Sequence, residues 1–273
     1  MPQQVKKAVF RPVGRASVPS WRLMLALAAL LLPGAALAQT PEPSAEFAQP
    51  AAAPAAPDGF YLRLAVGPAF AHFSTRYDDH EFVLMGAALA PELAAGFTVA
   101  EKLELTLGLS GTVMIAPGME MSVLGQDESI NRNQATQINA GVGLTYYLPY
   151  DFYIGGSAAV SYFVLTLNER GLNEAAGHIY SLNPDAVDFR KQLPDSTESA
   201  YGIVGGHHLG FAAQIQVGKE WAVSEDAGLG LGVQYLFAVY PKFLSGAEEQ
   251  AAGRDRILWL GHSAALMLSA TYN

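Results

Sequence analysis

Residues 141–167 read GVGLTYYLPYDFYIGGSAAVSYFVLTL and contain a single charged residue, Asp151. A transmembrane helix needs about twenty mostly apolar residues, so hydropathy alone would allow one here. Pro149, however, lies near the centre of the stretch, and glycines and serines are scattered through it. On both sides of Pro149, apolar residues alternate with small or polar ones, which is the period of a β-strand. The stretch therefore predicts a hairpin of two long strands with Pro149 in the turn.

The same alternation recurs in eight segments of the chain. They lie at 59–73, 88–99, 103–114, 136–148, 152–166, 207–221, 228–239 and 257–272. Their connections alternate between short ones, at 100–102, 149–151 and 222–227, and long polar ones, at 74–87, 115–135, 167–206 and 240–256. An even strand number with this asymmetry of connections is typical of bacterial outer-membrane barrels. We therefore predict an all-β fold over 59–273, an eight-stranded antiparallel up-and-down transmembrane β-barrel with short periplasmic turns and long extracellular loops.

The two faces of the predicted strands have unlike compositions. One face is apolar and lacks Asp, Glu and Arg through its middle, whereas the other is mostly Gly, Ala, Ser, Thr, Asn and Gln. The alternative is a soluble secreted barrel or sandwich, whose outer face would be charged. The low charge of both faces favours a membrane barrel with a narrow interior.

Large aromatic residues on the apolar face gather at two levels. Those near the short turns predict a periplasmic-side aromatic belt and are Phe60, Phe97, Tyr146, Phe152, Trp221 and Tyr272. A second group lies toward the long loops and consists of Phe70, Tyr162, Tyr235 and Phe237. Lys219 has lipid-facing parity beside Trp221, and its long side chain is expected to extend to the headgroups.

The first 38 residues predict a signal peptide. Basic residues precede the apolar run 23–32, which is too short to span a bilayer, and Ala36-Leu37-Ala38 before Gln39 matches the small-x-small cleavage pattern. The alternative is a retained N-terminal anchor.

Residues 39–58 are rich in Pro and Ala and predict a disordered linker. Removing the five basic residues of 1–38 leaves eleven of the sixteen, against twenty-five acidic residues. The resulting net charge of −14 argues against a nucleic-acid partner.

The opening GFYLRLAVG at 59–67, the eight strands and the final strand resemble the small eight-stranded outer-membrane β-barrel proteins of the OmpA/OmpX/OmpW-like group. The resemblance covers 59–273. It implies outer-membrane lipid around the barrel and the outer-membrane assembly machinery as a partner, which reads the C-terminal strand. In that strand Leu266, Leu268, Ala270 and Tyr272 alternate as the signal requires, but the chain ends on Asn273 where the family usually ends on an aromatic residue.

Four charged residues have the parity of the lumen, namely Arg63, Glu92, Glu104 and Glu220. Unpaired charge in a narrow, poorly hydrated interior is costly, so pairing is expected. We predict a salt-bridge plug in the turn-side half, in which Arg63 bridges Glu104 and Glu220 while Glu92 sits higher. The alternative is that the four are separately solvated in a water-filled channel. Eight strands leave little room beyond side chains, which favours the plug.

No motif predicts catalysis, a cofactor or a metal site. The chain has no cysteine, which excludes a thiolate site and a catalytic cysteine. Asp78-Asp79-His80-Glu81 offers oxygen and imidazole ligands but lacks the spaced oxygens and glycine of a calcium loop, so a solvated loop is expected. His262 and Ser263 are adjacent on a strand and face opposite sides, so they do not form a nucleophile–base pair. We therefore expect no catalytic residues and no metal ligands.

Three functions are open. The first is a non-enzymatic outer-membrane protein with a structural or surface-interaction role and a largely closed lumen. The second is a narrow porin-like channel for small solutes, and the third is a lipid-modifying outer-membrane enzyme. Loop 167–206 is longer than a connection between strands requires, as in loops that bind or stay disordered, but the sequence identifies no extracellular partner.

Overall fold

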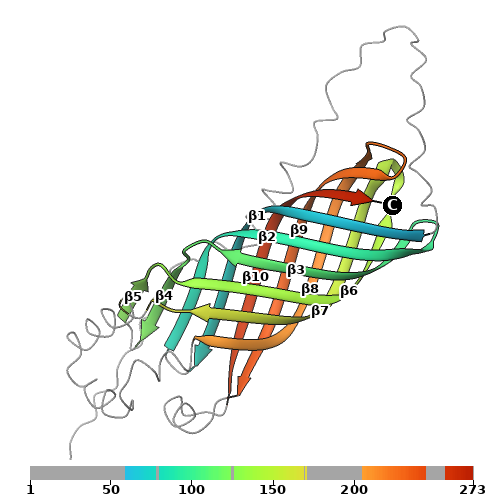
Figure 1. Cartoon of the computed structure of the whole chain (residues 1–273). Coiled ribbons are helices and arrows are strands. Elements are labelled where there is room, and N and C mark those ends of the chain that lie inside the picture. Colours follow the sequence, from blue (N-terminus) through green and yellow to red (C-terminus); the bar gives the residue numbers. More distant parts are fainter. Residues whose placement is uncertain are drawn as a thin grey trace, which may run out of the picture. The chain divides into compact units, whose positions relative to one another are not determined.

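The computed structural model describes residues 59–77, 80–123, 126–168, 170, 205–243 and 256–272. The predicted signal peptide, its cleavage site at Ala38 and Gln39, and the linker 39–58 lie outside these residues, as does most of loop 167–206. The strands are β1 (Phe60–Tyr77), β2 (His80–Ala100), β3 (Leu103–Met114), β4 (Gly118–Val123), β5 (Gln126–Ile130), β6 (Gln134–Tyr147), β7 (Phe152–Thr166), β8 (Gly206–Ala222), β9 (Ala227–Phe243) and β10 (Arg256–Tyr272) (Figure 1).

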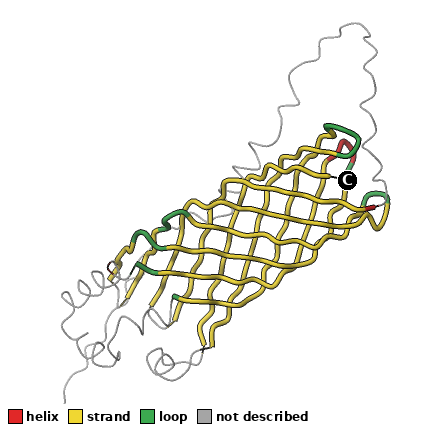
Figure 2. Tube along the Cα trace, in the orientation of Figure 1, coloured by secondary structure: helices red, strands yellow, loops and turns green. Residues whose placement is uncertain are grey.

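The eight long strands form a closed antiparallel barrel, with β4 and β5 as a short additional hairpin. Each long strand pairs with the next one along the chain, and β1 pairs with both β2 and β10, which closes the sheet. Figure 2 shows the strands crossing the barrel obliquely, as closure of a sheet requires. The predicted eight-stranded antiparallel up-and-down barrel is confirmed. Residues 141–167 lie in the β6–β7 hairpin, whose turn is the 3₁₀ segment Pro149–Asp151.

The barrel has a turn side, where β2–β3, β6–β7 and β8–β9 are joined, and a loop side at the opposite end. The strands extend further on the loop side than the sequence indicated. β1 and β2 pair as far as Tyr77 and His80, so the predicted long loop 74–87 is wrong. Within the predicted loop 115–135, β4 and β5 pair with each other, and β4 pairs with the loop-side half of β2. Beyond the apolar part of the outer face, outward-facing residues need not be apolar. The two faces of β1 and β2 therefore no longer differ in composition there, although the strands continue to pair.

Asn133 fastens the β4–β5 hairpin to the barrel. The chain breaks its strand pairing at 115–117 and 131–133, where Ala116 and Arg132 have positive φ angles of 47° and 65°. The buried Asn133 side chain donates to the carbonyl oxygens of Ile130 at 2.8 Å and Pro117 at 3.3 Å. Its Oδ1 accepts from the backbone N–H of Asn168 at 3.0 Å. The side-chain amide of Asn133 thus connects both breaks in strand pairing to the chain that follows β7.

The two faces of the sheet differ as the alternation predicts. Each long strand exposes large hydrophobic side chains on its outer face, such as Leu107, Val142 and Leu268, and buries the intervening residues. The inner face carries small and polar residues together with Tyr61 and Tyr153 on the turn side, and mostly large apolar residues on the loop side. In the part of the chain that the structure describes, no helix has the length and apolarity to cross a membrane.

Candidate functional site in the lumen

A buried ion pair lies in the turn-side half of the lumen. Arg63 on β1 is 4% exposed and forms a salt bridge with Glu92 on β2. The register places Arg63 opposite Ala94 and Glu92 opposite Ala65, so the two are diagonal neighbours on one face, within reach of long side chains. Arg63 also donates to Gln216 at 2.9 Å, and Gln214 donates to Glu92 at 2.8 Å.

Glu104 and Glu220 are buried in the same half of the lumen but have other surroundings. Glu220 accepts hydrogen bonds from the hydroxyl groups of Tyr147, at 3.2 Å, and Thr271. Glu104 has one carboxylate oxygen, Oε2, that is buried without a hydrogen-bond partner. The expected bridge ran from Arg63 to Glu104 and Glu220, whereas the structure pairs Arg63 with Glu92. Counted together, the four lumen residues carry one positive and three negative charges when ionised.

Polar contacts continue from the ion pair toward the loop side. Ser110 donates to Gln214 at 3.3 Å, and Asn139 donates to Ser110 at 3.2 Å. Ser161 donates to Asn139 at 2.6 Å and lies 2.8 Å from the hydroxyl group of Tyr240. Residues from β1, β2, β3, β6, β7, β8 and β9 are thereby joined into one network, which ends where the aromatic rings begin. Such a network fixes the rotamers of a polar interior.

A small cavity lies beside this network. Its volume is about 30 Å³, and its lining includes Arg63, Glu92, Asn139 and Gln214. Glycines on β3, β6 and β7 also line it and leave the space that larger side chains would fill. A volume of this size holds about two ordered waters, and the polar lining supplies the partners they need. The cavity can hydrate the network but is too small for an organic solute.

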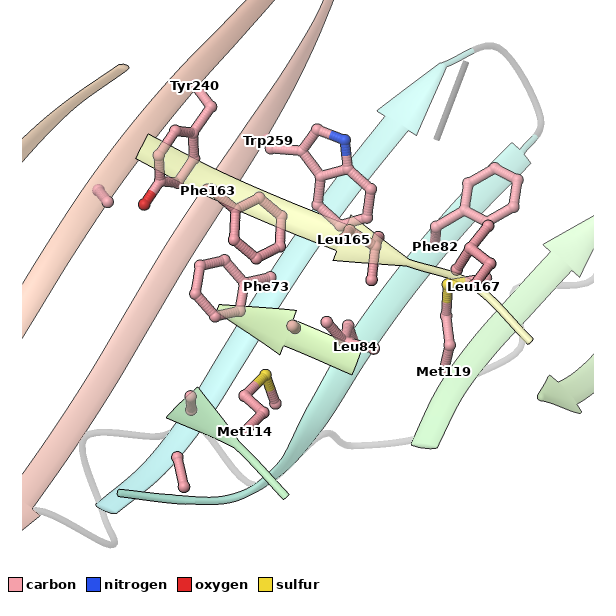
Figure 3. Packing of buried hydrophobic residues seen from close by; sticks show 14 of the residues in the cluster. Phe73, Phe82, Leu84, Met114, Met119, Phe163, Leu165, Leu167, Tyr240 and Trp259 are labelled. Carbon is pink, nitrogen blue, oxygen red and sulfur yellow. The ribbon is translucent and has the colours of Figure 1, made fainter. Parts of the chain in front are cut away.

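The loop-side half of the lumen is filled by a packed apolar cluster (Figure 3). The rings of Phe73 and Phe163 stack with centroids 4.3 Å apart, and Trp259 and Tyr240 lie 6.0 and 5.3 Å from Phe163. The β4–β5 hairpin adds Met119 and Ile130, and the two have no exposed surface. None of the buried residues of the cluster is more than 7% exposed, as in a protein core.

This cluster has a signature in the sequence that strand parity alone does not reveal. At the loop-side end of β7 and one residue beyond it the sequence reads YFVLTL (162–167), so both faces are apolar and the alternation of composition is lost. A continuous apolar run is consistent with a strand buried on both faces. Phe163 and Leu165 are accordingly fully buried in the lumen, while Tyr162 faces outward.

The six residues of the predicted turn-side belt all lie exposed on the outer face, and each is close to the turn-side end of its strand. Phe60 and Phe97 contact edge to face with centroids 6.0 Å apart. The ammonium group of Lys219 lies 5.0 Å from the ring of Phe152 and 5.6 Å from that of Trp221. Aromatic rings with a cation among them suit the boundary between acyl chains and headgroups.

The other residues considered for catalysis or metal binding do not come together in one site. His262 bonds the hydroxyl group of Tyr235 on the outer face, whereas Ser263 contacts Thr112 inside the lumen at 3.4 Å. Within the described ranges, no three His, Cys, Asp or Glu side chains are grouped so that they could hold a metal ion. Asp78 and Asp79 of the Asp78-Asp79-His80-Glu81 motif lie outside those ranges.

Comparisons with known proteins add no family assignment. No protein-family model matches the chain, and no curated protein matches it. Similar solved structures include the outer membrane protein OprG from Pseudomonas aeruginosa, with 14% identity over 79% of this chain and 97% of that one and a TM-score of 0.40. Neisserial surface protein A has 10% identity over 78% and 96%, with a TM-score of 0.37. The outer membrane protease OmpT from Escherichia coli has 8% identity over 79% and 97%, with a TM-score of 0.39.

These similarities are too weak to indicate an activity, and the fold follows from the strand pairing itself. The chain is a closed eight-stranded up-and-down barrel with an apolar outer face. That is the architecture of the small outer-membrane barrels.

Proposed function

We propose that this chain is an integral outer-membrane protein with a closed lumen and a non-enzymatic structural or surface-interaction role. The observation that carries the proposal is the packed apolar cluster around Phe73 and Phe163, which fills the loop-side lumen. A solute that enters from the turn side would meet a cavity of about 30 Å³ and then this cluster.

The outer face supports the membrane location. On β7 the belt residue Phe152 and the loop-side Tyr162 are ten residues apart and share the outer face. At about 3.3 Å per residue and a tilt of about 40°, ten residues rise about 25 Å, which is the height of the apolar band of such barrels. The side chains exposed between them on β7 include Ile154 and Val160. By the same architecture, the short turns would face the periplasm and the loops the exterior.

Conductance in planar bilayers tests the closed lumen. The wild-type protein should show no stepwise conductance, because ions cannot pass the apolar cluster. Phe73→Ala combined with Phe163→Ala removes the stacked ring pair and should admit water and ions, with Phe70→Ala on the outer face as the matched control. Regular conductance steps from the wild-type protein would contradict the closed lumen.

A narrow channel is the second candidate, and the polar network with its adjoining cavity favours it. The network and its cavity occupy the turn-side and central lumen, where a permeating ion would find polar partners. For this function the apolar cluster would have to open. Stepwise conductance of the wild-type protein that increases in the double alanine variant would favour this candidate.

A further inference from the structure

Two tyrosine–histidine pairs lie on the outer face toward the loop side. The hydroxyl group of Tyr162 on β7 is 2.6 Å from Nδ1 of His207 on β8. The hydroxyl group of Tyr235 on β9 is 2.6 Å from Nδ1 of His262 on β10. The same pairing therefore occurs twice, on two separate pairs of neighbouring strands. His72 on β1 lies directly opposite His262, with ring centroids 6.3 Å apart.

Both pairs lie at the same height on the barrel. Tyr162 is ten residues from the belt residue Phe152 along β7, and His262 is ten residues from the belt residue Tyr272 along β10. In both strands this separation corresponds to about 25 Å, the thickness of the apolar band. The pairs therefore lie where the acyl chains end and the headgroups of the loop-side leaflet begin. This placement rests on the membrane location proposed above.

The hydrogen bonds determine which ring nitrogen is available to a ligand. A phenol hydrogen on a lipid-facing surface needs an acceptor, and Nδ1 of the adjacent histidine supplies one. A neutral imidazole that accepts at Nδ1 carries its proton on Nε2, which is then a donor. Among the described residues, Nε2 of His207 and of His262 has no hydrogen-bond partner. Each pair thus offers one N–H donor at the depth of the lipid headgroups.

Charges nearby favour an anionic ligand. Arg76 and Arg256 are exposed on the outer face at the loop-side ends of β1 and β10, beyond His72 and His262. Glu81, which is paired in register with Arg76, is the exposed acidic residue on the adjoining part of β2. Among the described residues, the two guanidinium groups share the strands of His72 and His262, whereas the exposed carboxylates of this part of the rim, Glu81 and Glu120, lie on β2 and β4. The chemistry that combines an anion with acyl chains is a lipid headgroup phosphate.

We propose that His207 and His262, with His72 beside the latter, bind headgroup phosphates of the surrounding lipid. The tyrosines act as positioning residues, because each holds its histidine in the tautomer that donates from Nε2. The acyl chains of the same lipid lie on the exposed apolar surface of β7–β10 and β1. Inorganic phosphate lacks those chains and should bind at least tenfold more weakly.

The test uses the folded protein in dodecyl maltoside, a detergent without phosphate, with ¹⁵N-labelled histidine. Titration with dihexanoyl phosphatidic acid should shift the Nε2 signals of His207 and His262 saturably, while dihexanoylglycerol, which has the same acyl chains without phosphate, should not. His207→Phe and His262→Phe keep an aromatic ring but remove the donor, and each should weaken binding about fivefold. Tyr146→Phe at the opposite belt is the matched control and should bind as the wild type does.

The results separate this proposal from the membrane assignment. Equal response to phosphatidic acid and dihexanoylglycerol, or unchanged affinity in both His→Phe variants, would overturn the phosphate site. The wild-type titration gives an answer even if a variant fails to fold. Failure of the wild-type protein to insert into phosphatidylcholine vesicles would instead contradict the proposed function.

Discussion

Replacing Arg63 by alanine should destabilise the barrel strongly. The guanidinium group is 4% exposed and forms a salt bridge with Glu92 and a hydrogen bond with Gln216. Its removal leaves Glu92 buried with the amide of Gln214 as its remaining donor, in a lumen that also contains Glu104 and Glu220. Removing one partner of a buried ion pair costs about 3–5 kcal/mol. That is a large part of the 5–15 kcal/mol by which folded domains are typically stable.

The second substitution identifies the partner. Glu92→Gln in the Arg63→Ala background removes the stranded charge and keeps a polar side chain that Gln214 can contact, so it should restore most of the lost stability. Glu104→Gln in the same background should restore less, because Glu104 is not paired with Arg63 and only its repulsion is relieved. Together with the Glu92→Gln single variant, these proteins form a double-mutant cycle for the pair.

The measurement is equilibrium unfolding by urea from lipid vesicles, followed by tryptophan fluorescence. The expected order of stability is wild type, then Arg63→Ala with Glu92→Gln, then Arg63→Ala with Glu104→Gln, then Arg63→Ala alone. A free energy of unfolding for Arg63→Ala within about 1 kcal/mol of wild type would refute the buried ion pair, since its predicted cost is several times larger. Equal rescue by Glu92→Gln and Glu104→Gln would show that the charge total matters and the pairing does not.

Three further substitutions test the faces, the hairpin and the closure of the barrel. Val142→Arg places a charge on the outer face near mid-height and should cost about 2–4 kcal/mol of stability in vesicles, and tolerance equal to that of a loop position would contradict the lipid-facing assignment. Asn133→Ala removes the three hydrogen bonds that fasten β4–β5, so hydrogen exchange should accelerate across Gly118–Ile130 while the β8–β9 amides stay protected. In Gly67→Ala the new Cβ would lie 1.7 Å from the carbonyl oxygen of Leu266, so β1 should fail to pair with β10, and the folded band in heat-modifiability gels should be lost. Gly156→Ala is the control for that closure test, because its nearest atom would be 3.7 Å away.

Local information in the sequence determined the strands and their faces. A residue's side of a strand depends only on its parity, so alternation in 141–167 was sufficient to predict the β6–β7 hairpin and its turn at Pro149. Short connections force consecutive strands to pair as antiparallel neighbours, and eight such segments with one apolar face imply a closed barrel. The lumen parity of Arg63, Glu92, Glu104 and Glu220 followed from the same rule, and all four are buried.

Only the tertiary structure decided which lumen residues meet. Parity gives the face, but contacts across the lumen depend on register and strand tilt, which the alternation leaves open. The register makes Glu92 a diagonal neighbour of Arg63, although its position along the chain had suggested a higher level. Likewise, Phe73, Phe163 and Trp259 come from strands far apart in sequence and meet because the barrel closes. The apolar cluster in the loop-side lumen therefore forms only in the closed sheet, since its residues come from several strands.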